Sequence, residues 1–189
     1  MKRKDISMSY VIARASLPAS TVWIRPAAGN PRRGWLIAAG INIPVALGRG
    51  GIRTNKREGD GGTPRGIFHP RKLWWRADRH MRPRTFLTVR PIHHDDAWCE
   101  DPNHRHYNQP VRLARDTAGD RLKRKDHLYD FIVEIDHNTR PRMRNRGSAV
   151  FLHLAREHLA PTAGCVAMRK QAMLQLLQRL GPRTRIIIG

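Results

Sequence analysis

The sequence has few cysteines, few acidic side chains and no long apolar run. Cys99 and Cys165 are the only cysteines in 189 residues. That is too few for a disulfide-rich scaffold, and leaves either a single bridge or a reactive thiol. No apolar stretch is long enough to span a membrane. Residues 1–20 make a poor signal peptide, because Asp5 interrupts the basic start and the apolar run 8–13 ends at Arg14. Export would therefore need a route that the sequence does not reveal, or a different native start.

The shortage of acids gives the chain an extreme charge. Lys and Arg number 36 against 15 Asp and Glu, so the formal net charge is +21 and the isoelectric point is near 11.6. A field this positive attracts polyanions. The basic residues are spread along the chain, and no zinc-finger, RRM-like or KH-like signature is present. Charge alone leaves three readings open: a nucleic-acid partner, an acidic cell-wall polymer, or no specific role.

The apolar pattern predicts a single, mainly β domain over residues 20–189 after a basic lead, residues 1–19. Gly and Pro number 15 and 13, and most lie between short β-prone runs. A helix is expected over 169–180, where the apolar residues have helical spacing and Gly181-Pro182 ends the pattern. The Gly-rich stretch 48–66 predicts a long loop, and the polar stretch 91–127 an insertion or lid. The expected strands are 21–25, 34–38, 41–47, 85–90, 128–135, 149–154 and 185–188.

The segment 147–168 holds the strongest candidate for chemistry. It predicts a strand that ends at His153, a loop, and Gly164-Cys165 before a helix. A free thiol is only slightly ionised at neutral pH, but an imidazole can take its proton and a helix N-terminus can stabilise the thiolate. Gly164 allows close backbone approach, so nearby N–H groups can form an oxyanion hole. The alternative reading is a small buried cysteine beside a hydrogen-bonded core histidine.

Three ordered blocks carry a family resemblance. Residues 56–68 are similar to a Gly-Asp-x-x-Thr-Pro-x-Gly loop and the strand after it. His153 and the later Thr162–Val166 fit the frame of a strand histidine followed by Ser/Thr-His-Gly-Cys. Residues 98–102, 107–108 and 128–130 resemble a compact subgroup of the same family. From about residue 20 to 189 the chain thus resembles the L,D-transpeptidase (YkuD-like) catalytic domain.

The resemblance implies a β-sandwich with a few short helices and a polar lid. It implies Cys165 as nucleophile, His153 as base and Gly164 beside the oxyanion hole. The implied partners are peptidoglycan stem peptides in the periplasm or cell envelope, with no nucleic acid, metal or cofactor and with the oligomeric state open. The residues expected to bind substrate are Thr162, Ala163, Tyr129, His94 and Trp98.

The chain also departs from the family frame. Ala163 stands where the family has His, Ala167 where it usually has Arg, and residues 153 and 165 are closer than in the better-known members. The departures imply a subgroup that joins a first-position L-alanine to a third-position diaminopimelate; the other reading is a link between two third-position residues. Three further alternatives stay open: an L,D-carboxypeptidase, a basic nucleic-acid-binding protein, and a wall-binding module without chemistry.

Two other groups of residues invite different interpretations. His93, His94, Cys99, His104 and His106 crowd a short stretch, but no pair has the spacing of a zinc motif, so a polar lid loop is the competing reading. The second group, three tryptophans, predicts either stacking platforms for bases or sugars, or core residues beside snorkelling arginines: Trp74, Trp75 and Trp98.

Overall fold

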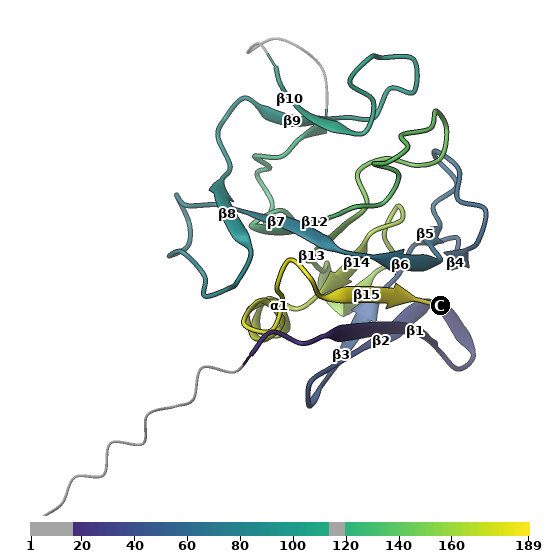
Figure 1. The fold of residues 1–189 in the computed structure, drawn as a ribbon, viewed down its shortest axis with the longest axis vertical. Helices are drawn as coiled ribbons and strands as arrows, with labels where there is room; N and C mark the ends of the chain where they lie inside the picture. The colour runs from purple at the N-terminus through teal and green to yellow at the C-terminus, as the bar shows by residue number, and fades with distance from the viewer. Residues whose placement is uncertain (1–16, 114–119) are drawn as a thin grey trace, which may run out of the picture.

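A ten-stranded mixed sheet organises the chain (Figure 1). The computed structural model describes residues 17–113 and 120–189. The strand order is β6-β15-β1-β2-β3-β14-β13-β12-β7-β8. The bounds, in that order, are Gly66–Phe68, Arg185–Ile188, Thr21–Ala27, Asn30–Ala38, Ile41–Ala46, Val166–Met168, Phe151–Leu154, Phe131–Ile135, Pro70–Trp75 and Thr88–Pro91.

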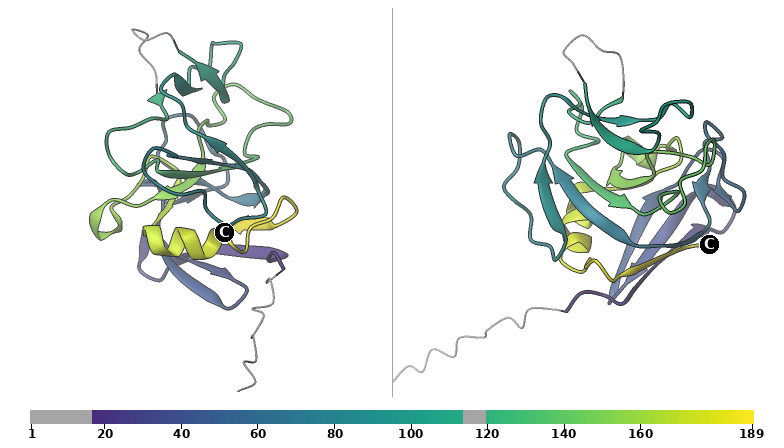
Figure 2. Two further views of the ribbon diagram at one scale, coloured as in Figure 1. Left: turned by 90° about the vertical axis from the view of Figure 1, so that its left-hand side faces the viewer. Right: turned by 45° about the horizontal axis from the view of Figure 1, so that its top comes forward.

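The sheet curls so that its β15–β1–β2–β3 half faces its β13–β12–β7 half across the main core (Figures 1 and 2). Strict alternation produces this arrangement: in β1, Val22 and Ile24 are fully buried, whereas Trp23 and Arg25 point outward. Helix α1 (Lys170–Leu177) adds Met173, Leu176 and Leu177 to the same core. The sequence therefore predicted the fold class correctly: the domain is mainly β, with one short α-helix among the residues that the structure describes.

The central strands bury their second face as well. Trp74 of β7, Ile132 of β12 and Phe151 of β13 pack in a second apolar cluster with Trp98 and Leu122. Trp98 belongs to β9 (Asp96–Cys99), and Leu122 directly follows β11 (Asp120–Arg121). In a small three-stranded sheet, drawn at the top of Figure 1, β9 pairs with β10 (Gln109–Arg112) and β11. The described parts of the polar segment expected as an insertion or lid, 91–113 and 120–127, thus form a folded unit seated on the outer face of the main sheet.

Two short features complete the fold around the site. Strands β4 (Ile52–Arg53) and β5 (Thr63–Pro64) pair within the Gly-rich stretch 48–66, which was expected to be a loop. A 3-10 turn, η1 (Glu157–Leu159), follows β13. Its Leu159 packs on Ala46 and Ala167, so the turn lies over the outer face of β3 and β14.

Some expected boundaries are wrong. Strand β7 was missed, because Pro70–Trp75 mixes basic and aromatic residues and is buried on both faces at its apolar end, which hides the alternation. The helix begins at Lys170 and ends at Leu177, and Cys165 precedes strand β14 rather than a helix. Val166 and Met168 are drawn into the main core with a period of two, which fixes that strand. Residues 1–16 of the expected lead, 1–19, lie outside the described residues.

Candidate active site

Strands β13 and β14 bring His153 and Cys165 to the same face of the sheet. The two strands run parallel, with Leu152 opposite Val166 and His153 opposite Ala167. Alternation places His153, Ala167 and Cys165 outward, since Leu152 and Val166 belong to the main core. His153 and Cys165 line one cleft of about 370 Å³. A loop separates His153 from Cys165 in the sequence, and the parallel pairing of β13 with β14 brings the two residues together in space.

His153 is held as a neutral base. Its Nδ1 donates a hydrogen bond of 2.8 Å to the Leu154 carbonyl, which can only accept, so Nε2 carries the free lone pair. Burial first, and then the nearby Arg124 and Arg156 charges, lower the pKa of His153 from 6.5 to about 4. Tyr129 contacts the imidazole edge-on at 5.4 Å between ring centroids, which fixes the ring plane.

Cys165 is held as a neutral thiol. Burial raises its pKa to about 12, and its exposed fraction is 8%. The Sγ–H group donates to the Ala149 carbonyl at 3.1 Å, and the Phe151 N–H donates to Sγ at 3.4 Å. The resting pair is therefore thiol and imidazole rather than thiolate and imidazolium. Ionisation of the thiol would break its hydrogen bond to the Ala149 carbonyl.

The turn before Cys165 is fixed by the Gly-rich segment. Thr162 Oγ1 donates to the Cys165 carbonyl at 2.6 Å and accepts from the Gly164 N–H at 3.1 Å. Gly164 has a φ of +147°, and a Cβ there would lie 2.9 Å from the Gly62 carbonyl oxygen. The backbone of Thr162 in turn bonds to Leu47 and Arg49. The expected oxyanion role of Gly164 stays a prediction, because its N–H is engaged by Thr162 in this state.

Charged residues of both signs line the cleft that contains Cys165. Arg49, Arg124 and Arg156 line the cleft together with Glu100 and Asp120. Glu100 keeps an exposed surface, and partial desolvation in the cleft, followed by the charges of Asp120 and Glu58, raises its pKa to about 7. Burial also raises the pKa of Asp120. The cleft thus offers guanidinium groups for carboxylates and two carboxyl groups of raised pKa for an amine.

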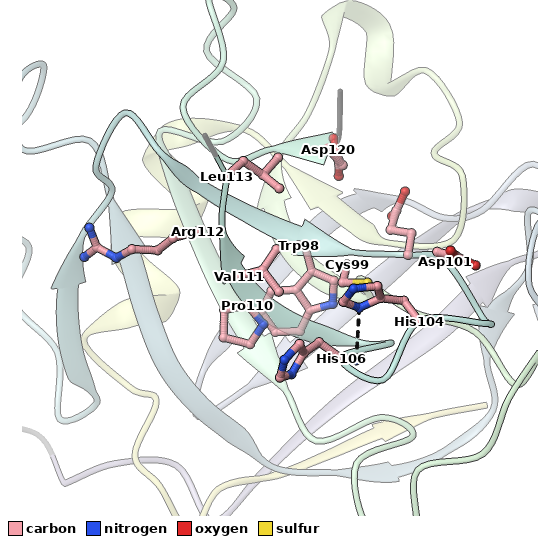
Figure 3. A pocket seen from close by; sticks show the side chains of 11 residues that line it. Trp98, Cys99, Asp101, His104, His106, Pro110, Val111, Arg112, Leu113 and Asp120 are labelled. Carbon is pink, nitrogen blue, oxygen red and sulfur yellow. Dashed lines mark hydrogen bonds between the residues drawn. The ribbon is translucent and has the colours of Figure 1, made fainter. Parts of the chain in front are cut away.

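A second pocket, of about 700 Å³, adjoins this cleft and shares Glu100 and Asp120 with it. Figure 3 shows Trp98, Pro110 and Val111 lining this pocket from β9 and β10. The dashed line there joins the His106 N–H to His104 Nδ1 at 3.1 Å. Across residues 17–113 and 120–189, no group of three or more His, Cys, Asp or Glu side chains is arranged to hold a metal ion.

Asn108 connects the lid sheet to the loop that precedes His153. Its Oδ1 accepts from Trp98 Nε1 and from the Ala149 N–H, each at 3.1 Å. Its Nδ2 donates to the carbonyls of His137 and Asn138 at 3.0 and 2.9 Å. Asn108 has a φ of +54°, a conformation that Asn adopts more readily than most residues. One buried amide therefore positions Ala149, whose carbonyl holds the Cys165 thiol.

The structure gathers some of the expected substrate-binding residues and not others. Tyr129, Thr162 and Ala163 line the cleft with Cys165 and His153. Trp98 lines the adjoining pocket and packs edge-on against Phe151, with 4.9 Å between ring centroids. His94 is exposed and outside the set of described residues that line either pocket.

Sequence reasoning missed most of the charged cleft residues. The cleft-lining residues without a motif are Arg49, Glu100, Asp120, Arg124 and Arg156. They come from four separate loops or short strands, and in a chain with 36 basic residues nothing distinguishes these arginines from the rest. The only available signal was the polar character of 91–127, which contains three of the five.

The chain is a mainly β domain in which Cys165 and His153 line one cleft beneath a small lid sheet, and this arrangement defines its class. The model of the L,D-transpeptidase catalytic domain family, YkuD, matches residues 13–188. The chain belongs to this family. Among solved structures it is similar to the crystal structure of Mycobacterium tuberculosis L,D-transpeptidase 1, with 11% sequence identity and a TM-score of 0.37. That match covers 89% of this chain and 61% of the other, so the chain spans about three-fifths of its length. No curated protein matches the chain.

Proposed function

We propose that the protein is a peptidoglycan L,D-transpeptidase that works through a Cys165 thioester. The observation that supports this most is the His153 ring: Nδ1 is fixed on the Leu154 carbonyl, and Nε2 is left as a base in the cleft that contains Cys165. Family membership supports the same reaction class. The proposed substrates are stem peptides of the cell envelope, and the proposed location is the periplasm or envelope. No helix in the described residues is long and apolar enough to cross a membrane.

The reaction proceeds in two balanced steps. Cys165 Sγ attacks the carbonyl of an L-residue that precedes a D-centre, and its proton passes to His153 Nε2. When the C–N bond breaks, His153 returns that proton to the leaving amine, and a thioester remains. The D-centre amine of a second stem then attacks the thioester, its proton passes through His153 to the sulfur, and a new amide bond forms. Backbone N–H groups near Gly164 and Cys165 are proposed to hold the oxyanion.

The donor is proposed to be the first-position L-alanine, joined to a third-position diaminopimelate. Ala167 lies in the cleft, where the family usually has Arg, so that charge is missing from β14. Arg49, Arg124 and Arg156 supply guanidinium groups at other points of the same cleft. Because these guanidinium groups lie away from position 167, they support recognition of a donor whose carboxylates also lie away from that position. A link between two third-position residues is the competing outcome.

Mass spectrometry of muropeptides tests the proposal. Purified sacculi and monomeric muropeptides are incubated with the wild type, with Cys165→Ala, and with Cys99→Ser as a matched control that removes the other thiol. New dimers made by the wild type and Cys99→Ser, but not by Cys165→Ala, are expected. Fragmentation then identifies the donor residue. An active Cys165→Ala protein would refute the mechanism.

Two other outcomes identify the alternatives. Shortened stems without dimers would indicate that water is the acceptor and that the enzyme is a carboxypeptidase. Unchanged muropeptides, together with nucleic-acid binding that is steeply salt-dependent and indifferent to Cys165→Ala, would instead support a basic nucleic-acid-binding protein.

A further inference from the structure

The outward face of the sheet carries an apolar band outside the residues that line the cleft. Four large side chains are exposed there: Trp23 by 39%, Trp35 by 43%, Ile37 by 42% and Ile67 by 53%. They occupy the positions that alternate with the core residues of β1, β2 and β6. A contiguous exposed apolar surface of this kind usually marks an interaction site, because monomeric proteins otherwise avoid it.

Strand register makes the band continuous. Trp23 lies opposite Ile37 on β2 and opposite Ile187 on β15, and Ile187 lies opposite Ile67 on β6. Two residues away from Ile37 on β2, and so on the same face, Trp35 lies opposite Arg25. We call Trp23, Trp35, Ile37, Ile67 and Ile187 the tryptophan face. Its two indoles are presented from adjacent strands of a sheet, on a rigid support.

Arginines border the tryptophan face. The Arg25 guanidinium lies over the Trp23 ring, 5.0 Å from its centroid. Arg25 and Arg65 also line a shallow hollow of about 570 Å³ together with Trp23 and Ile67. Aromatic rings with neighbouring cations suit a ligand that has both apolar faces and negative charge.

The tryptophan face and the catalytic pair share one face of one sheet. His153 lies opposite Ala167, Ala167 opposite Ala46, and Ala46 opposite Arg33 on β2. Arg33 and Trp35 are two positions apart on β2, so they point the same way. The η1 turn rises between the two regions, where Arg33 Nη2 donates to the His158 carbonyl at 2.6 Å. A long ligand that crosses this turn reaches both regions.

We propose that the tryptophan face binds the glycan strand of peptidoglycan. The C–H faces of pyranose rings pack on the indoles of Trp23 and Trp35, while Arg25 and Arg65 meet the carboxylates of neighbouring stem peptides. The choice of glycan rests on the proposed function, whose substrate hangs from such strands. Charge complementarity favours this ligand, since the chain has a net charge of +21 and the polymer carries carboxylates. The face holds the enzyme on the polymer while the cleft selects a stem.

The test measures binding to glycan strands from which an amidase has removed the stem peptides, and to a soluble oligomer of N-acetylglucosamine. Wild type is compared with the double variant Trp23→Thr/Trp35→Thr, in which threonine suits a strand. Phe86→Thr is the matched control, because Phe86 is 47% exposed and lies beside the opposite edge of the sheet, before β8. Thermal unfolding confirms that each variant is folded.

The expected result is binding by the wild type and Phe86→Thr, and a loss of roughly tenfold or more in the double variant, since two stacking residues are removed. All binding is repeated in the Cys165→Ala background, so a failure of the proposed chemistry leaves this result readable. Equal binding by the double variant, or none by the wild type, would overturn the inference. So would a wild-type dimer that the double variant converts to monomer, which would assign the face to a second copy. Displacement of the glycan by duplex DNA with unchanged tryptophan dependence would assign it to a nucleic acid.

Discussion

Removing the Asn108 side chain should destabilise the protein and loosen the nucleophile. Asn108 is 5% exposed and makes four hydrogen bonds, two of them from buried donors. In Asn108→Gly, Trp98 Nε1 and the Ala149 N–H lose their acceptor, at about 1–3 kcal/mol each. The carbonyls of His137 and Asn138 are partly exposed and can be rehydrated, so they add little. The expected loss in free energy of unfolding is about 3 kcal/mol.

A pair of variants separates hydrogen bonding from backbone strain. Asn108→Ala loses the same bonds and also forces a Cβ residue to adopt a φ of +54°. It should therefore be about 1 kcal/mol less stable than Asn108→Gly. Asn108→Asp keeps the two acceptor bonds but opposes a carboxylate to two carbonyl oxygens, so it should also be destabilised.

Guanidinium unfolding measures these free energies, and alkylation of Cys165 at neutral pH reports on the site. We expect faster alkylation in Asn108→Gly, because a displaced Ala149 no longer holds the thiol proton. A loss of less than about 1 kcal/mol in Asn108→Ala would refute the reasoning. It would mean that the lid sheet and the β13 loop are coupled by apolar packing rather than by this amide.

Three further predictions concern the cleft. Burial lowers the pKa of His153 from 6.5 to about 4, so folding favours its neutral form. The resulting contribution to the free energy of unfolding is complete above pH 6.5 and falls by about 3 kcal/mol as the pH drops from there through 4. Acid unfolding of the wild type and His153→Gln should show that part of the loss only in the wild type, and cross-linking should fall through the same pH. Gly48→Ala places a Cβ 2.1 Å from the Gly61 carbonyl oxygen and should cost about 1–3 kcal/mol in denaturant unfolding, whereas Gly29→Asn, with open space and an acceptable φ, should be near neutral. Cys99→Ser should keep wild-type rates in the muropeptide assay, since Cys99 lies outside the residues that line the cleft.

The sequence was informative where one physical rule acts alone. Alternation of buried and exposed residues located β1, β3 and β15 within two residues of their ends, whereas the expected start of β2, at residue 34, is four residues late. Helical spacing located α1. The helix ends at Leu177, and Leu180 fills the core from the turn that follows it. The alternation pattern failed for β7, which is covered on both faces at its apolar end, and for β14, which has only three residues.

The residues of the site can also be divided into those that the sequence indicated and those that it did not. A local frame, Thr162 to Cys165 with His153 before it, indicated the residues that adjacent strands bring together. The cations and acids around them are contributed by tertiary structure, and single arginines carry no signal in so basic a chain. The interpretation of Trp74 and Trp98 as core residues agrees with their exposed fractions of 0% and 5%. Trp23 and Trp35 were overlooked, although each occupies the opposite phase of alternation from its apolar neighbours, which was a readable signal.

The neutral state of Cys165 also affects how the protein withstands an oxidising surrounding. Peroxide and other oxidants attack the thiolate far faster than the thiol. With its pKa near 12 and its S–H donating to the Ala149 carbonyl, the sulfur is almost entirely unionised at neutral pH. In the proposed mechanism Cys165 is thus latent: it resists sulfenic acid formation while idle, and becomes reactive only when His153 removes its proton.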